Sequence, residues 1–237
     1  MTAAAFSTGG SPLWYATRAT GVVALVLLTL TVVLGIAGAG RLTAPGAPRI
    51  ITAGLHRNIS VLVVALVAVH VLTTVADGYV PISLASAVVP FSAPYRRLWL
   101  GLGAVALDLL LAVGVTSALR DRIPRRAWRA VHWLGYFAWP VALLHGLGTG
   151  SDVRLGWMLA VNVACTAVVL VAVVARSLIG WPKHARVRVG ALGAVLAFAL
   201  GLLVWVPAGP LGSRWARRAG TPASLLAPHP VGHGGSG

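Results

Sequence analysis

The sequence has very few charged residues and almost no acidic ones. Charged side chains make up 10% of its 237 residues, with four aspartates and no glutamate. Hydrophobic residues make up 58%, and the mean hydropathy is +0.87. This composition excludes an ordinary soluble domain and indicates a polytopic membrane protein. Cys165 is the single cysteine, which excludes an internal disulfide.

The net charge of +15 would indicate nucleic-acid binding in a soluble protein. Here the basic residues lie in loops between apolar segments, where they act as topology signals and contact lipid headgroups. We therefore expect the lipid bilayer, and not nucleic acid, as the partner of these residues.

The apolar residues form six stretches, each near the roughly 20 residues that a helix needs to cross the hydrocarbon core. The six stretches are 20–38, 59–76, 98–119, 130–147, 156–177 and 189–207. The predicted fold is all-α, a six-transmembrane-helix bundle over residues 14–207. The first stretch is predicted to be a retained span and not a signal peptide, because no basic region precedes it. Residues 1–13 and 208–237 are predicted to be a flexible N-terminus and a disordered tail.

Basic residues are concentrated in the loops after the first, third and fifth stretches. The positive-inside rule therefore places these three loops in the cytoplasm and both termini outside the plasma membrane. In this orientation the second and fourth spans run parallel to each other.

Four histidines lie in these two parallel spans. His56 and His70 are 14 residues apart in the second, and His132 and His145 are 13 apart in the fourth. At a rise of 1.5 Å per residue, both spacings correspond to roughly 20 Å along the membrane normal. A histidine inside a span indicates a functional site, and neutral imidazole is a standard axial ligand of haem iron. Matched levels on two parallel helices predict two stacked bis-histidine haems.

The angular positions agree less well. Fourteen steps return His70 to within about 40° of His56 around the helix, whereas thirteen steps turn His145 well away from His132. Pro140 lies between the latter two and is expected to kink or rewind the helix. The alternative is that these histidines form helix-end or interhelical hydrogen bonds. Asp108, midway along the third span, is either a proton carrier or a protonated structural residue.

Haem propionates need nearby cations or hydrogen-bond donors. Arg57 adjoins His56 and Arg129 precedes His132, so both are candidates for the cytoplasmic haem, and Trp133 is a candidate for packing on a porphyrin. The candidates for the outer haem are Arg96, Arg97 and Arg154. No catalytic side chain is predicted.

The sequence resembles the ferric-reductase-like transmembrane superfamily over residues 15–177. The resemblance lies in the basic loop before Trp128, in the pattern Trp128-x-x-x-His132-x-x-x-Tyr136 followed by His145, and in His56-Arg57 with His70. This superfamily includes ferric reductases, NADPH oxidases and the haem subunit of the bacterial methionine-sulfoxide reductase system. The resemblance implies that His56 and His132 bind an inner haem b, and that His70 and His145 bind an outer one.

The resemblance also implies a bacterial electron-transfer component of an oxidoreductase, which moves electrons across the membrane from a flavin or nicotinamide donor. We expect no flavin or nicotinamide site in this sequence, because Gly146-Leu-Gly-Thr-Gly150 is predicted to be a loop at a helix end and does not match a nucleotide-binding turn. The expected redox partner is therefore a separate flavoprotein, such as an FMN-binding protein, or a quinone. The donor, acceptor and oligomeric state stay open. Two alternatives also stay open: a single-haem variant of the same fold, and a cofactor-free transporter or assembly protein.

Overall fold

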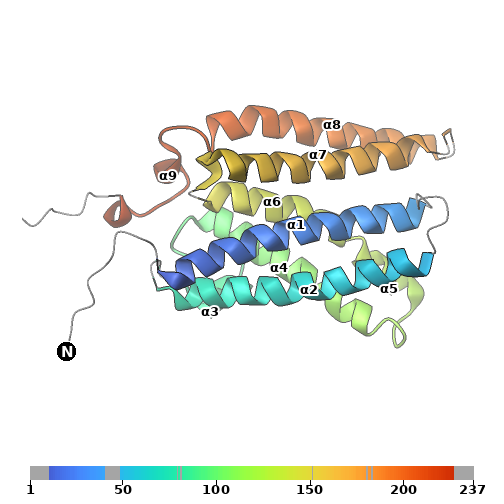
Figure 1. The fold of residues 1–237 in the computed structure, drawn as a ribbon, viewed down its shortest axis with the longest axis horizontal. Helices are drawn as coiled ribbons and strands as arrows, with labels where there is room; N and C mark the ends of the chain where they lie inside the picture. The colour runs from blue at the N-terminus through green and yellow to red at the C-terminus, as the bar shows by residue number, and fades with distance from the viewer. Residues whose placement is uncertain are drawn as a thin grey trace, which may run out of the picture.

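The computed structural model describes residues 11–40, 49–78, 80, 82–150, 152–179, 181–182 and 184–226. Its regular elements in these ranges are all helical, and they form a bundle of roughly aligned helices (Figure 1). Five of the helices are long and apolar enough to cross a membrane. These five are α1 (Pro12–Gly40), α2 (Arg49–Ala76), α4 (Arg97–Ala118), α7 (Gly156–Leu178) and α8 (Ala185–Ala208).

Shorter helices connect or extend the long ones. They are α3 (Leu84–Val88), α5 (Arg125–His132), α6 (Gly135–Thr149), α9 (Trp215–Arg218) and the 3₁₀ turns Asp152–Arg154 and Ala223–Leu225. The start of α1 has a clear local cause. Pro12 occupies its first turn, where the missing N–H costs nothing, and the Ser11 hydroxyl accepts from the Trp14 N–H at 3.0 Å.

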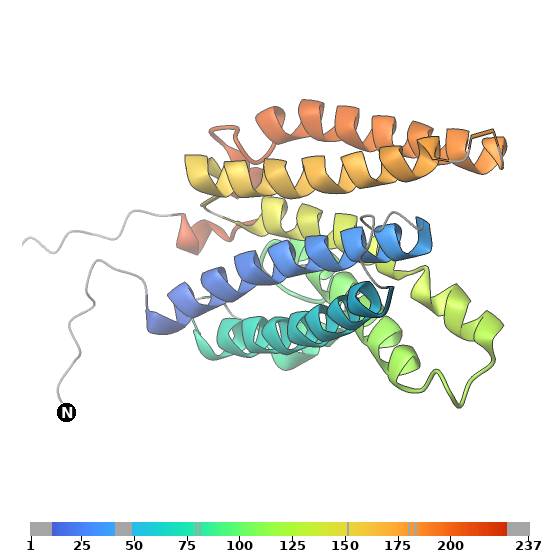
Figure 2. The same ribbon diagram turned by 45° about the vertical axis from the view of Figure 1, so that its right-hand side comes forward.

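The predicted fourth span is divided into two helices, so the structure has five long candidate spans where the sequence predicts six. The chain bends between α5 and α6, and Figure 2 shows α5 tilted away from the bundle. The break is at Trp133 and Leu134, ahead of Pro140, which lies inside α6. Hydrogen bonds from residue i to i−3 run through this break, at Leu134 to Val131, at Tyr136 to Trp133 and at Phe137 to Leu134.

This local tightening explains how a spacing of thirteen residues still aligns two histidines. A 3₁₀ turn advances about 120° per residue against about 100° in an α-helix. Three or four such steps supply roughly 60–80° of extra rotation, a large part of the angle by which His145 would otherwise miss the line of His132. The rewinding expected at Pro140 therefore takes place nearly two turns earlier, at Trp133 and Leu134.

The core of the bundle lies where α1, α2, α6 and α7 meet. Leu143 on α6 is fully buried, and it packs in one cluster with Leu28 on α1, Val63 on α2 and Val169 on α7. Helix α6 lies in the middle of the bundle in Figures 1 and 2, whereas α8 is outermost and has no buried residue. Apolar side chains exposed along α8 are what a lipid-facing helix requires.

The chain beyond residue 208 differs from the expected disordered tail as far as residue 226. Trp215 is 8% exposed, and its indole N–H donates to the Gly148 carbonyl at the end of α6. Buried Arg96 also ties this segment to α6, because its guanidinium donates to Thr221 and to the Gly148 and Thr149 carbonyls. An anchoring tryptophan and arginine therefore order this segment, despite its many small residues. Residues 227–237, and residues 1–10 of the predicted N-terminal extension, lie outside the described ranges.

Candidate functional site

The four histidines form two pairs inside the bundle. The ring centroids of His56 and His132 are 6.1 Å apart with an angle of 68° between the planes, and those of His70 and His145 are 6.4 Å apart at 86°. These are the two pairs that the level spacing predicts. Among the residues that the structure describes, no three His, Cys, Asp or Glu side chains come together. Each pair therefore offers two imidazoles from two different helices.

Three of the histidines are held in one orientation by backbone carbonyls. The Nδ1 atoms of His56, His70 and His145 lie 3.0, 2.8 and 2.8 Å from the carbonyl oxygens of Thr31, Thr17 and Trp99. A carbonyl only accepts, so Nδ1 carries the proton and donates, and the Nε2 lone pair of each ring stays available. A metal-binding histidine commonly has this arrangement.

A glycine one turn after each of these carbonyls makes room for the ring. A Cβ atom at Gly21 would lie 2.9 Å from a His70 carbon, and one at Gly103 would lie 2.6 Å from a His145 carbon. At Gly35 the corresponding distance to His56 is 3.4 Å. Each ring is therefore held by a carbonyl at position i and a glycine at position i+4, which we call the carbonyl–glycine module.

Sequence reasoning missed these modules, although they leave a signal. Thr17-x-x-x-Gly21 and Thr31-x-x-x-Gly35 are 14 residues apart in α1, the same spacing as His56 and His70 in α2. The two helices are antiparallel and packed together, so the first module faces the second histidine. A matched spacing in neighbouring helices is the pattern that would have pointed to α1.

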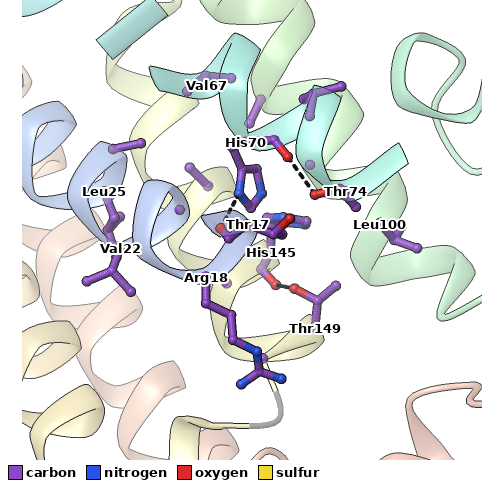
Figure 3. A pocket seen from close by; sticks show the side chains of 18 of the residues that line it. Thr17, Arg18, Val22, Leu25, Val67, His70, Thr74, Leu100, His145 and Thr149 are labelled. Atoms are coloured by element: carbon purple, nitrogen blue, oxygen red, sulfur yellow. Dashed lines mark hydrogen bonds between the residues drawn. The ribbon is translucent and has the colours of Figure 1, made fainter. Parts of the chain in front are cut away.

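The His70–His145 pair borders a cavity of about 380 Å³, within the usual size range of cofactor pockets. Apolar side chains line most of it, and Figure 3 shows the two imidazoles meeting in its interior. Polar groups gather at its edge, where Arg18 forms an ion pair with Asp152 and stacks over the ring of Trp14. The guanidinium of Arg18 points away from the histidines (Figure 3).

The arginines predicted to serve an outer haem lie elsewhere. Arg96 is buried against the carbonyls at the end of α6, Arg97 donates to the Phe91 carbonyl and Arg154 to the Gly212 carbonyl. None of the three lines the cavity, and the arginine that does, Arg18, was not predicted.

The other predicted cofactor contacts are Arg57, Arg129 and Trp133, which are close in sequence to His56 or His132. All three lie at the surface of the bundle. Arg57 and Arg129 are exposed, and Trp133 is 59% exposed and contacts Tyr136. The structure does not bring them into the His70–His145 cavity. The tryptophan that is buried beside the core is Trp139, whose indole N–H donates to the Thr29 hydroxyl at 2.8 Å.

A family model described as ferric reductase like transmembrane component matches residues 20–143. The match covers most of α1, all of α2 to α5 and most of α6, including three of the four paired histidines. The chain belongs to this ferric-reductase-like transmembrane family. No curated protein and no solved structure matches the sequence.

Ferric-reductase-like domains generally bind haem, and the two histidine pairs fit that group. A metal–imidazole bond is about 2.0 Å long and the ligating nitrogen lies about 1 Å from its ring centre, so two imidazoles sharing one metal have centroids about 6 Å apart. The observed separations of 6.1 and 6.4 Å agree with that value. The free Nε2 atoms of His56, His70 and His145, and the apolar cavity, complete the fit.

Proposed function

We propose that this protein is the haem subunit of a membrane oxidoreductase and moves electrons across the membrane through two haems b. His56 and His132 would hold one haem, and His70 and His145 the other. The observation that supports this most directly is the pairing itself, with both centroid separations near the value for a shared metal. Bound haem would supply one-electron chemistry, and the chain supplies the ligands, their fixed orientation and a dry surrounding.

The positive-inside rule supports an orientation in the plasma membrane with both termini outside, so that the His56–His132 haem is near the cytoplasm. We propose Arg57 and Arg129 as partners of the propionates of this haem, with Trp133 beside its porphyrin. For the outer haem, Arg18 replaces Arg96, Arg97 and Arg154, because Arg18 borders the cavity and these three do not. The redox partner would be a separate flavoprotein, such as an FMN-binding protein, or a quinone.

A reduced-minus-oxidised difference spectrum of the purified protein, with a pyridine haemochrome count, tests this proposal. We expect a b-type spectrum at about two haems per chain. Changing His70 or His145 to alanine should remove one haem, and changing His56 or His132 should remove the other. Absence of Soret absorption in haem-supplied protein would reject the proposal. A cofactor-free transporter would then become the better interpretation, and it would keep its function after all four changes.

A single-haem variant is the second candidate, and one observation favours it. His132 lies on the short helix α5, and its buried Nδ1 has no hydrogen-bond partner among the described residues, unlike the other three histidines. A ratio near one haem per chain, lost on changing His70 but kept on changing His132, would support this candidate.

A further inference from the structure

The environment of His132 departs from the pattern that holds the other three histidines. On α4, Trp99 and Gly103 form the carbonyl–glycine module of His145. His132 comes 13 residues before His145, and α4 runs antiparallel to α5 and α6. Because the 3₁₀ steps at the break rise about 2.0 Å per residue, the chain from His132 to His145 covers about the same height as 14 residues of α-helix. The corresponding level on α4 is therefore about 14 residues after Gly103, at position 117. That residue is serine, so the fourth module has a hydroxyl where the others have only a hydrogen atom.

Three polar atoms at this end of the bundle are buried without a hydrogen-bond partner in the described part of the chain. They are the Ser117 hydroxyl oxygen, the Trp128 indole nitrogen and Nδ1 of His132. Trp128 and His132 are four residues apart on α5, with their rings stacked at 4.9 Å and 24°. An unpaired buried polar group costs about 1–3 kcal/mol, so three of them on two contacting helices indicate an incomplete network rather than three independent accidents.

The two N–H donors on α5 are matched by the two lone pairs of the Ser117 oxygen, whose own hydrogen remains free to donate elsewhere. When Nε2 of a histidine binds a metal, Nδ1 carries the proton and donates. The indole N–H also only donates, whereas a hydroxyl oxygen has two lone pairs and accepts twice. One serine oxygen on α4 can therefore satisfy two donors on α5, and no backbone carbonyl is needed.

We propose that Ser117 is the positioning residue of His132. Its hydroxyl accepts from the His132 Nδ1–H and from the Trp128 indole N–H, directly or through one bound water, and so takes the place of the carbonyls of Thr17, Thr31 and Trp99. This inference rests on the proposed function, because it assigns Nε2 of His132 to a haem. A partner of this kind fixes the ring and raises its basicity as a ligand. The His56–His132 haem thereby depends on a side chain, whereas the other haem depends on backbone alone.

The test compares three variants of the full-length, haem-loaded protein in detergent. Ser117→Ala removes the hydroxyl, Ser117→Thr keeps it, and Ser177→Ala makes the same change at a buried serine on α7 whose hydroxyl already donates to the Val173 carbonyl at 2.8 Å. A redox titration gives the midpoint potential of each haem, and transfer to excess apomyoglobin gives the rate at which each haem is lost. Helical circular dichroism confirms that each variant is folded.

In Ser117→Ala we expect one haem to be held about tenfold or more weakly and its midpoint potential to rise, because the ligand donates less electron density. The midpoint potential and loss rate of the other haem should not change in Ser117→Ala. In Ser177→Ala and in Ser117→Thr, both haems should have the potentials and loss rates of the unmodified protein. A complete loss of one haem in Ser117→Ala, with both kept in Ser117→Thr, would support the inference equally.

The inference is wrong if Ser117→Ala leaves both potentials and both loss rates unchanged. It is also wrong if Ser177→Ala produces the same shift, or if Ser117→Thr fails to restore the haem. These results would leave the proposed function standing. Unmodified protein without haem would instead reject the proposed function, and the inference with it.

Discussion

At the scale of the residue, the glycines beside the histidines are the positions where an added methyl group would displace a proposed haem ligand. Alanine at Gly103 would place a Cβ atom 2.6 Å from both Cε1 and Nδ1 of His145, so the ring must move and lose its bond to the Trp99 carbonyl. Overpacking of this kind costs about 1–3 kcal/mol. We therefore expect Gly103→Ala to lower the melting temperature and to remove one of two haems, as measured by thermal melting and haemochrome count.

Gly193→Ala is the control, and it is expected to have no harmful effect on stability. A Cβ atom at Gly193 meets nothing within 4 Å, and alanine inside a helix is better than glycine by about 0.5–1 kcal/mol. Gly193→Ala should therefore keep both haems and leave stability unchanged or raised. If Gly103→Ala behaves like this control, the close contact with His145 is not what holds the ring.

The three glycines should also differ among themselves. The nearest ring atom lies 2.6 Å from the Cβ position at Gly103, 2.9 Å at Gly21 and 3.4 Å at Gly35. Alanine at Gly103 should therefore cost the most haem and alanine at Gly35 the least, since 3.4 Å is ordinary van der Waals contact. A haemochrome count on the three variants checks the order, and a reversed order would contradict the packing argument.

At the scale of the element, the pairing of the histidines was predictable from the sequence and the break after α5 was not. Helix rise fixes the level of each residue, so spacings of 14 and 13 suffice to match His56 with His132 and His70 with His145. The break depends on a few i to i−3 bonds near Trp133, which have no strong sequence signal when a proline nearby offers a more obvious cause. The modules on α1 and α4 depend on which helix faces which, and one sequence read alone does not supply that.

Because the rotation occurs before Pro140, this proline is not required for the alignment of His132 and His145. Pro140→Ala restores a backbone N–H inside α6, so we expect both haems to be kept and the melting temperature to stay the same or rise. Haem content and thermal melting check this. Loss of either haem in Pro140→Ala would show that the proline is needed for the alignment of His132 and His145.

The segment after α8 closes the end of the bundle near His145. Trp215 is 8% exposed, and its N–H donates to the carbonyl of Gly148, three residues after His145. Removing a buried tryptophan side chain costs about 3–5 kcal/mol. We expect Trp215→Ala to accelerate loss of the His70–His145 haem and to leave the other haem unaffected, measured by haem transfer. Trp157→Ala, at a side chain that is 58% exposed, should change neither haem.

At the scale of the whole molecule, the two histidine pairs divide the thickness of the membrane between them. The 14 residues from His56 to His70 along α2 correspond to roughly 21 Å of helix rise, most of the roughly 30 Å hydrocarbon core. A haem at each level brings one redox centre close to each membrane surface, and neither centre reaches both surfaces alone. Transfer across the membrane should therefore need both pairs.

Proteoliposomes with ferricyanide inside and a membrane-impermeant reductant outside measure this transfer directly. The protein inserted in either direction should reduce the trapped ferricyanide, since the chain of two haems conducts both ways. We expect His56→Ala and His70→Ala each to keep one haem that is still reduced by dithionite, and each to lose ferricyanide reduction by at least tenfold. If a variant with one remaining haem still transfers electrons at the full rate, the two pairs do not form one path, and the single-haem interpretation becomes the correct one.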